Sequence, residues 1–325
     1  PSPRSDTTIC TREAVVVSFI HMFSRSARRV AATRRGAGVR VLAAAALPLI
    51  HQQCSFTNMR SSCESSVAGA DMSIQQFVTS KKAQKWIYLN ADKSQSCLVN
   101  TDEIQWIETA ANGVKRKMIE RLGGEVARAT TVVQFGANAS FPEHEHEGGE
   151  EFIVLAGDWI DDWATQPKNT YVRNYIGSRH TPRMGPEGVT ILVKLCQMSE
   201  KHPEPEHTQW DISEANPDWK ECTDIKGRRL LHVFKSPNEE VRFERWMPGA
   251  QGTVPVPALG EEVFVLEGSF SDGMGEHRKW SWARNSGEVS EHVRKAGAEG
   301  CFLYVKSKHL KSPEVDLEAL CLKRQ

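Results

Sequence analysis

The sequence predicts an all-β protein that contains two tandem copies of one β-sandwich or β-barrel unit. Short apolar segments of strand-forming residues recur along the chain between turn residues, as in sandwiches and barrels. These segments leave little room for long helices. The segment GEEFIVLAG at 149–157 is restated by GEEVFVLEG at 260–268, which indicates an internal repeat.

The composition is that of an ordinary globular protein. The chain has 325 residues, of which 39% are hydrophobic and 25% are charged, and this length accommodates two domains of common size. The formal net charge is zero, so no general affinity for nucleic acid or for a membrane surface is expected. The eight cysteines are scattered and form no CxxC pair, which favours free thiols in a reducing compartment over a redox motif.

Residues 1–71 are predicted to be a targeting or disordered segment outside the folded domains. They contain nine Arg and no Lys against four acidic residues, and no acidic residue occurs from Ala14 to Cys63. An Arg-rich, Ser-bearing and acid-poor segment is typical of an organelle transit peptide. The first methionine is Met22, and the residues after it would form a mitochondrial presequence.

Other interpretations of this segment remain open. The apolar run from Val41 to Ile50 is too short to span a bilayer, but it would suit a secretory signal or half of a plastid signal. A basic tail without a targeting role is a further alternative. We expect a mitochondrial location, with a plastid as the alternative, or the cytoplasm if translation starts at Met72.

The first domain is predicted to span residues 72–205. Its expected strands are Lys85–Leu89, Ile104–Ile107, Ala129–Phe135, Tyr171–Arg173 and Val189–Leu195. Asn90 to Asp102 is expected to be a loop. The chain from Ser199 to Lys226 is polar and contains three prolines, which indicates a connection between domains. His202 and His207 in this connection are interpreted as surface-loop histidines.

The stretch FPEHEHEGGEEFIVLAG, from Phe141 to Gly157, carries the clearest chemical signal. His144 and His146 are two residues apart, so on a strand their imidazoles point to the same face. Glu150 follows at the start of an apolar strand. Two imidazoles and a carboxylate suit a borderline divalent metal such as zinc, iron, manganese or nickel. A further histidine, His180, follows a glycine turn in GSRHTPR.

HxHxxxE followed by a glycine, with a later Gly-x-x-His, resembles the two signature motifs of the cupin superfamily. PEHEHEGGEEFIVLAG, TYVRN, GSRHTPR and EGVTILVKL together resemble ChrR-type cupins, a group that includes the zinc-binding sensor of ChrR anti-sigma factors and sequences named as dihydroxyacetophenone dioxygenases. The resemblance implies a double-stranded β-helix (jelly-roll) barrel with one metal bound by His144, His146, Glu150 and His180. The proline usual two residues before the second motif's glycine is Tyr175 here.

A second cupin barrel is predicted over residues 206–325, where the same pattern recurs. EHVRKAGAEGCFLYVK restates RHTPRMGPEGVTILVK and places His292 opposite His180 in the repeat. Alignment of the motifs places Pro255 and Pro257 at the positions of the first two histidines. Proline has no donor atom, so the second copy is expected to keep the fold and to bind no metal, with Glu261 and His292 as a hydrogen-bonded pair.

The metal identity stays open between zinc and iron, with manganese and nickel as alternatives. The first hypothesis is a metal-dependent, dioxygenase-like enzyme acting on a small carbonyl or hydroxyketone, with Tyr175, Arg173 and Arg183 as candidate catalytic or supporting residues near His180, although each also suits a structural role. The second is a non-catalytic ligand-binding or sensing module, and the third is an oxygen-independent lyase or isomerase. The expected partner is a small-molecule substrate or ligand, and a homodimer is left open.

Overall fold

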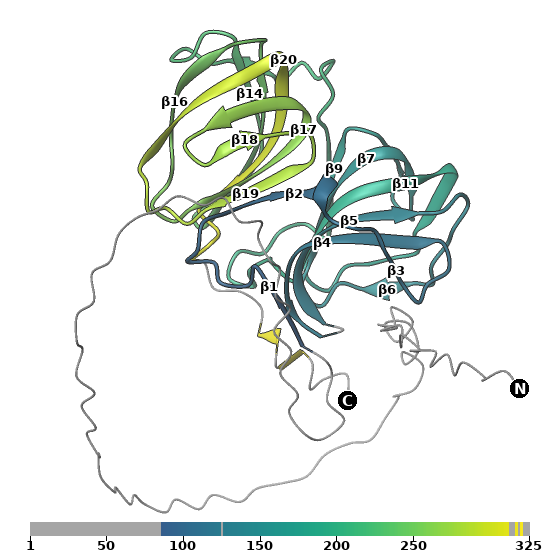
Figure 1. Ribbon diagram of the computed structural model, residues 1–325. Helices are drawn as coiled ribbons and strands as arrows, with labels where there is room; N and C mark the ends of the chain where they lie inside the picture. Colours follow the sequence, from purple (N-terminus) through teal and green to yellow (C-terminus); the bar gives the residue numbers. More distant parts are fainter. Residues whose placement is uncertain (1–85, 125, 312–315, 318, 321–325) are drawn as a thin grey trace, which may run out of the picture. The chain divides into compact units, whose positions relative to one another are not determined.

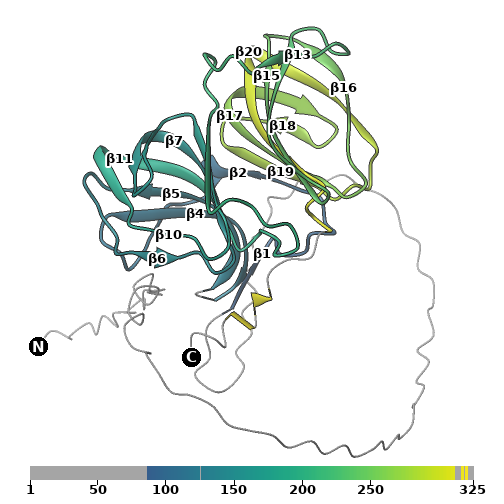
Figure 2. The same cartoon turned by 180° about the vertical axis from the view of Figure 1, so that it is seen from behind.

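The computed structural model describes residues 86–124, 126–311, 316–317 and 319–320. Nearly all of the regular structure in this part of the chain is β-strand, organised in two large antiparallel sheets (Figures 1 and 2). The predicted all-β class is therefore confirmed. The predicted targeting segment, residues 1–71, lies outside the described residues.

The first large sheet forms one barrel wall with the strand order β1-β4-β5-β11-β7-β9-β12, and with β3 and β8 attached at β4 and β7. Its strands are β1 (Ile87–Leu89), β3 (Ile107–Glu108), β4 (Val114–Gly123), β5 (Ala127–Phe135), β7 (Glu150–Ile160), β8 (Thr165–Pro167), β9 (Thr170–Asn174), β11 (Arg183–Leu195) and β12 (His207–Asp211). A separate pair of short strands consists of β6 (His144–Glu145) and β10 (Arg179–His180).

The second large sheet repeats this arrangement, with the order β13-β14-β15-β20-β17-β19-β2. Its strands are β2 (Cys97–Asn100), β13 (Lys220–Glu221), β14 (Arg228–Ser236), β15 (Glu239–Trp246), β16 (Gln251–Pro255), β17 (Glu261–Asp272), β18 (Gly275–His277), β19 (Ser281–Asn285) and β20 (Glu291–Ser307). A 3₁₀ turn, Thr101–Glu103, follows β2. The shared strand order confirms that the sequence repeat is a repeat of the fold.

The edge strands of the two sheets lie where the sequence analysis expected a loop and a connection. Strand β12 lies inside the expected connection Ser199–Lys226 and pairs with β9 of the first sheet. Strand β2 lies inside the expected loop Asn90–Asp102 and pairs with β19 of the second sheet. Both expectations were wrong at these points. Strand β12 begins just after the boundary expected at residue 205/206 and still belongs to the first sheet. Strand β2, which completes the second sheet, lies in the sequence between β1 and β3 of the first sheet.

Two glycines show why the same turn recurs in both copies. Gly157 and Gly268 occupy the left-handed backbone region, with φ values of 73° and 70°. A Cβ on either would lie 2.0 Å from a carbonyl oxygen, that of Gly188 in the first barrel and that of Gly300 in the second. Only glycine permits both the backbone conformation and this close approach. The glycines therefore fix the local bulge where β7 meets β11 and where β17 meets β20.

Each barrel has an apolar core of its own, and a third cluster joins the two. Phe152 and Trp159 belong to the core of the first barrel, and Val265 and Phe270 to that of the second. The joining cluster contains residues of both copies: Ile119, Val132, Ile153, Leu155, Tyr171, Leu192, Ile212, Trp219, Leu231, Val241, Phe243, Phe264, Leu266, Trp282, Phe302 and Tyr304. The two barrels therefore pack on one another through a continuous apolar interface.

Two buried ion pairs cross this interface in a reciprocal manner. Lys306 of the second barrel lies 2.5 Å from Glu151 of the first, and Lys194 of the first lies 2.5 Å from Glu262 of the second. The two lysines hold equivalent positions in the repeat, as do the two glutamates. Each barrel therefore supplies the same face to the other, with the pseudo-twofold character of an isologous interface.

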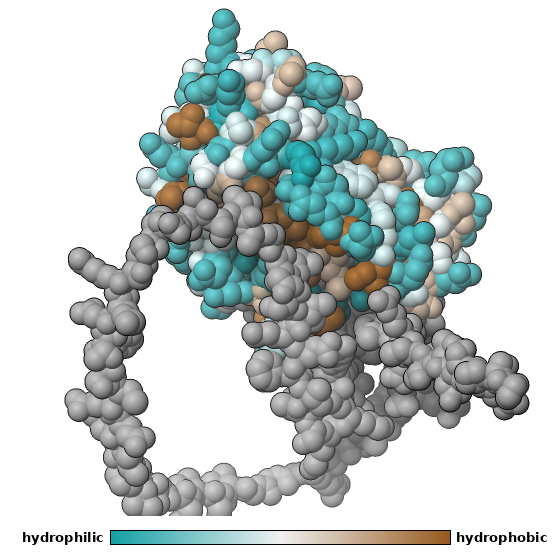
Figure 3. Space-filling model, viewed as in Figure 1, coloured by the Kyte–Doolittle hydropathy of each residue, from teal (hydrophilic) through white to brown (hydrophobic). Residues whose placement is uncertain are grey.

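The face in Figure 3 is mostly hydrophilic, with hydrophobic residues in a few small areas. The large exposed apolar residues are Tyr88, Ile107, Met247, Leu259, Val289 and Val293. No helix in this part of the chain has the length and apolarity needed to cross a membrane. Among the described residues, Cys97, Cys222 and Cys301 are free thiols, as predicted.

Candidate metal centre

Three histidines from distant parts of the sequence meet inside the first barrel. Strands β6 and β10 pair in antiparallel fashion with His144 directly opposite His180. The backbone N–H of His146, two residues on, donates to the carbonyl of Ser178 at 3.0 Å. Residues directly opposite one another in a pair of strands have side chains on the same face. The pairing therefore directs the three imidazoles to one point.

The spacing of the imidazole nitrogens fits a metal ion. Nε2 of His180 lies 3.0 Å from Nε2 of His146 and 3.3 Å from Nε2 of His144. A metal ion bound about 2.0–2.1 Å from each nitrogen places neighbouring nitrogens about 2.8–3.4 Å apart for bond angles between octahedral and tetrahedral. Within the described part of the chain, these three residues form the group of donor side chains able to hold a metal.

The outer nitrogens of two of these rings are engaged, which turns Nε2 toward the centre. Nδ1 of His144 donates to the carbonyl of Pro142 at 3.2 Å, and Nδ1 of His180 faces Oδ2 of Asp161 at 3.3 Å. Burial, together with the neighbouring imidazoles, lowers the pKa of His144 to about 4 and that of His146 to about 3. Both rings are therefore neutral near pH 7, the form in which a ring nitrogen can bind a metal.

A fourth donor, Glu150, lies beside the triad. Its Oε2 is 3.4 Å from Nε2 of His146 and 3.9 Å from Nε2 of His180. The same oxygen accepts a hydrogen bond from the side-chain amide of Asn174 at 3.0 Å. The residues present thus fit a three-histidine, one-carboxylate site, with Glu150 already held at the edge of the triad.

Asp161 supports the site and was missed in the sequence. Its Oδ1 accepts hydrogen bonds from the backbone N–H of Trp163 at 3.0 Å and of Ala164 at 3.2 Å. Burial alone would raise the pKa of Asp161, but hydrogen bonds from His180, Gln166 and these backbone amides lower it to about 2. Asp161 is therefore a carboxylate that fixes the orientation of the His180 ring, as carboxylates beside ligating histidines do. No local motif marks this residue, because its partner lies 19 residues away.

His207 is not the surface-loop histidine that the sequence suggested. It lies half-buried on β12, where the strand register places it opposite Asn174. Its Nδ1 lies 2.8 Å from Oδ1 of Asn174, and its ring stacks on Trp163 with a centroid distance of 4.3 Å. The expectation was wrong because β12 pairs with the first sheet, which draws His207 toward the metal centre.

The three candidate catalytic residues have other contacts in the structure. The guanidinium of Arg173 is fully buried and forms ion pairs with Glu151, Glu204 and Glu239. The hydroxyl of Tyr175 donates to the carbonyl of Ser199 at 3.2 Å. Arg183 is exposed at the start of β11. None of these contacts reaches the histidine triad, and a catalytic role for these residues stays a prediction.

The second barrel lacks the histidine triad. The residues that replace its first two histidines lie one position earlier in the sequence than the prolines that were expected there. His292 pairs with Val254, just as His180 pairs with His144. Val254 and Val256 are buried, whereas Pro255 is exposed. The positions of the first two histidines are therefore taken by valines, and the placement of prolines there was wrong. Valine also lacks a donor atom, so the second barrel has no equivalent ligand pair.

The remaining two ligand positions of the second barrel have separate partners. The expected pair of Glu261 and His292 does not form. Instead, Nε2 of His292 contacts the side-chain amide of Asn285. Glu261 lies 3.4 Å from Nη2 of Arg294 and 3.5 Å from Nη2 of Arg242. Arg294, which is 1% exposed, thus supplies a positive charge beside the carboxylate that corresponds to Glu150.

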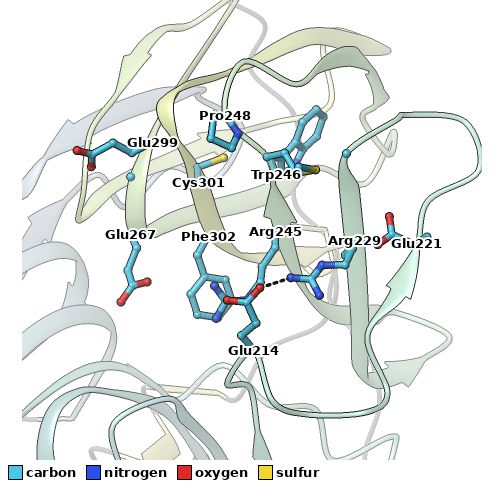
Figure 4. Close-up of a pocket in the computed structure, with 13 residues that line it drawn as sticks. Glu214, Glu221, Arg229, Arg245, Trp246, Pro248, Glu267, Glu299, Cys301 and Phe302 are labelled. Carbon is cyan, nitrogen blue, oxygen red and sulfur yellow. Dashed lines mark hydrogen bonds and ion pairs between the residues drawn. The ribbon is translucent and has the colours of Figure 1, made fainter.

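A pocket without histidines in its lining lies in the second barrel. It has a volume of about 380 Å³ and contains side chains of both charges (Figure 4). Arg229 forms an ion pair with Glu214 at 2.5 Å, and the guanidinium of Arg245 lies 3.8 Å from the ring centre of Phe302. Its lining residues include no histidine, so this pocket does not extend the metal centre.

Comparison with known proteins agrees with this architecture. The family model of the ChrR cupin-like domain matches residues 94–199 and 210–311, together more than half of the chain. No curated protein matches the sequence at a significant level.

Solved structures with the same fold include a candidate dioxygenase from Nostoc punctiforme, with a TM-score of 0.51 and 16% identity over 68% of this chain and 85% of that one. A candidate glyoxylate-induced protein from Pseudomonas aeruginosa has a TM-score of 0.51 and 12% identity over 68% and 90% of the two chains. The protein Ylba from E. coli has a TM-score of 0.50 and 13% identity over 69% and 95%. At these identities the likeness concerns the fold.

Proposed function

This chain belongs to the family of ChrR cupin-like domains, since the family model covers both of its barrels, and we propose that it is a metal-dependent enzyme acting on a small carbonyl or hydroxyketone substrate. The observation that carries the proposal is the convergence of three imidazoles next to the carboxylate of Glu150, with Nε2 of His180 3.0 Å from that of His146 and 3.3 Å from that of His144. Iron or zinc is the expected metal, with manganese and nickel as alternatives.

The arrangement of the site supports chemistry at one accessible face. His146 and His180 are buried, whereas His144 is partly exposed, so the open side of the centre lies at His144. A bound divalent metal would act as a Lewis acid that polarises a carbonyl or enolate oxygen. Asp161 keeps the Nδ1 proton of His180 in place, and Asn174 holds the carboxylate of Glu150. The candidate dioxygenase with the same fold supports the oxygen-dependent form of this proposal.

One feature favours a second candidate, a non-catalytic cupin that binds a ligand or senses zinc. Glu150 already lies beside the triad, and four protein ligands would complete a tetrahedral zinc site of the structural type. Zinc bound in this way would leave no position for a substrate. The two candidates therefore differ in whether a metal-replete protein turns over a substrate.

The test uses the full chain loaded separately with iron(II), manganese(II), nickel(II) or zinc(II). Oxygen uptake and product formation are measured with a panel of β-diketones and hydroxyacetophenones, in air and under nitrogen. We expect substrate-dependent turnover in the native protein and in His292→Ala, which alters only the second barrel, and no turnover in His180→Ala. Turnover under nitrogen would assign a lyase or isomerase. A metal-replete protein without turnover in either atmosphere would contradict the enzyme proposal and favour the binding module.

A further inference from the structure

We propose that His207 is a positioning residue of the metal centre, which holds Glu150 in place through Asn174. The inference rests on the proposed function, because it takes Glu150 as a metal ligand. His207 comes from the edge strand β12, outside the segment that carries the ligand motifs. It contacts Asn174, and Asn174 contacts the carboxylate of Glu150.

The chemistry of the three side chains determines which atom donates and which accepts in each of the two hydrogen bonds. A carboxylate only accepts hydrogen bonds, so the amide nitrogen Nδ2 of Asn174 donates to Oε2 of Glu150 at 3.0 Å. The amide oxygen Oδ1 of Asn174 is then the group that faces His207, 2.8 Å from Nδ1. Nδ1 of His207 must therefore carry the proton and donate. With both ends bonded, the amide of Asn174 cannot turn over without losing both hydrogen bonds.

The His207 ring is itself fixed on two sides. Its backbone lies opposite Asn174 in the β9–β12 pairing, and its ring stacks on Trp163 at an interplanar angle of 7°. The backbone N–H of Trp163 donates at 3.0 Å to Asp161, the carboxylate that orients His180. The supports of Glu150 and of His180 therefore meet at Trp163.

The second barrel provides an internal comparison without the histidine. Strand β2 pairs with β19 in the register that β12 adopts on β9, which places Ser96 at the position of His207. The hydroxyl of Ser96 lies 3.1 Å from that of Ser286. Asn285, the counterpart of Asn174, directs its amide nitrogen to His292 and not to Glu261. Where the edge strand lacks the histidine, the asparagine does not hold the carboxylate.

Two substitutions separate the hydrogen bond of His207 from its packing. His207→Phe keeps an aromatic ring on Trp163 and removes the donor, whereas His207→Gln keeps a donor and removes the ring. Zinc dissociation constants are measured by chelator competition on the full chain, and cobalt(II) absorption spectra report the ligand geometry. We expect His207→Phe to weaken zinc binding about 10–100-fold, as substitutions behind metal ligands do, and to change the cobalt spectrum. His207→Gln should retain most of the native affinity.

The coupling to Asn174 is tested by a double-mutant cycle. Asn174→Ala should weaken zinc binding as His207→Phe does, and the double variant should be no weaker than Asn174→Ala alone. The control is His202→Ala, a change in the same connecting segment at a histidine bonded to Asn238, which should leave zinc binding unchanged.

Three outcomes would overturn the inference. The first is native affinity and an unchanged cobalt spectrum in His207→Phe, and the second is additive losses in the cycle. The third is loss of affinity in His207→Gln equal to that in His207→Phe, since a retained hydrogen-bond donor would then make no difference. A native protein that binds neither zinc nor cobalt would contradict the proposed function itself, whereas the other outcomes leave it standing.

Discussion

At the residue scale, the site depends on imidazoles whose orientation is set by groups behind them. His146 shares the centre with His144 and His180, and its Nε2 lies 3.0 Å from that of His180. Removal of one ring leaves at most three of the four donors, including Glu150. The first and second predictions address a ligand and the carboxylate behind a ligand.

The first prediction is that His146→Ala abolishes stoichiometric metal binding. One of four ligands contributes a large share of a binding free energy of about 10–16 kcal/mol for structural zinc. Elemental analysis of the purified full chain measures the metal content, which should fall from one equivalent to a small fraction. His232→Ala, at a half-exposed histidine of the second barrel, is the control and should keep the native content. Full occupancy in His146→Ala would show that the metal lies elsewhere.

The second prediction is that Asp161→Asn weakens metal binding about 10–100-fold while the protein stays folded. The amide keeps the size of the side chain but lacks the negative charge that stabilises the Nδ1 proton of His180. Zinc affinity by chelator competition is the measurement. Asp272→Asn provides the matched control, because Asp272 holds His277 at 2.8 Å in the second barrel. If the two variants bound zinc with equal affinity, Asp161 would have no supporting role in the metal site.

At the element scale, the second barrel retains the strands of a metal site but has different side chains on them. Val254 and Val256 lie on the β16 side, and His292 lies on β20 opposite Val254. Arg294 provides the cation that Glu261 needs once no metal is present. The loss of metal binding in this barrel is therefore a change of side chains on an unchanged set of strands.

The third prediction is that a metal site can be built in the second barrel by three changes. The variant Val254→His, Val256→His, Arg294→Ala brings two imidazoles to His292 and removes one of the two guanidinium groups beside Glu261, leaving that of Arg242. It should bind two equivalents of zinc per chain by elemental analysis. The variant with both histidines but with Arg294 retained should bind one, because the guanidinium keeps Glu261 engaged. Two equivalents in both variants would show that Arg294 does not oppose metal binding.

The sequence predicted the two barrels and the ligand motif because both are local patterns. Strand periodicity, glycine turns and HxHxxxE are each contained in a short stretch of sequence. The internal repeat presents the strand and turn pattern twice. The support of the site was not predictable in this way, since Asp161 and His207 meet their partners only through sheet pairing. The one-residue error at Pro255 arose because seven positions separate Val254 from Glu261, whereas six separate His144 from Glu150.

At the scale of the whole molecule, buried charges join the two barrels. Glu239 of the second barrel lies 2.6 Å from Arg173 of the first and 3.1 Å from Lys306. Burial alone would raise the pKa of Glu239, but the charges of Arg173 and Lys306 lower it to about 2. A carboxylate in this position links the packing of the barrels to pH.

The fourth prediction concerns acid stability. The folded-state pKa of Glu239 lies below the value of an unfolded glutamate, so its contribution is present at neutral pH and is lost as pH falls from about 4.5 toward 2. Protonation should cost on the order of 2–3 kcal/mol, since a tenfold change in proton binding corresponds to about 1.4 kcal/mol. Urea unfolding at pH 7 and at pH 3 measures the difference.

Glu239→Gln should lower the free energy of unfolding at pH 7 and reduce its fall toward pH 3. Glu276→Gln, at an exposed position, serves as the comparison and should keep the native pH dependence. An undiminished fall in Glu239→Gln would assign acid instability to other carboxylates.

The edge strand β2 has a consequence for synthesis on the ribosome. Asn100 of β2 emerges early, but its partner Ser281 follows 181 residues later. The nascent chain therefore carries an unpaired strand edge during the whole time in which the first barrel is made, and such edges invite pairing with other chains. Contacts so distant in sequence also slow folding. Completion of the second sheet is thus a late step, because a strand translated ahead of most of the first barrel waits for residues near the end of the second.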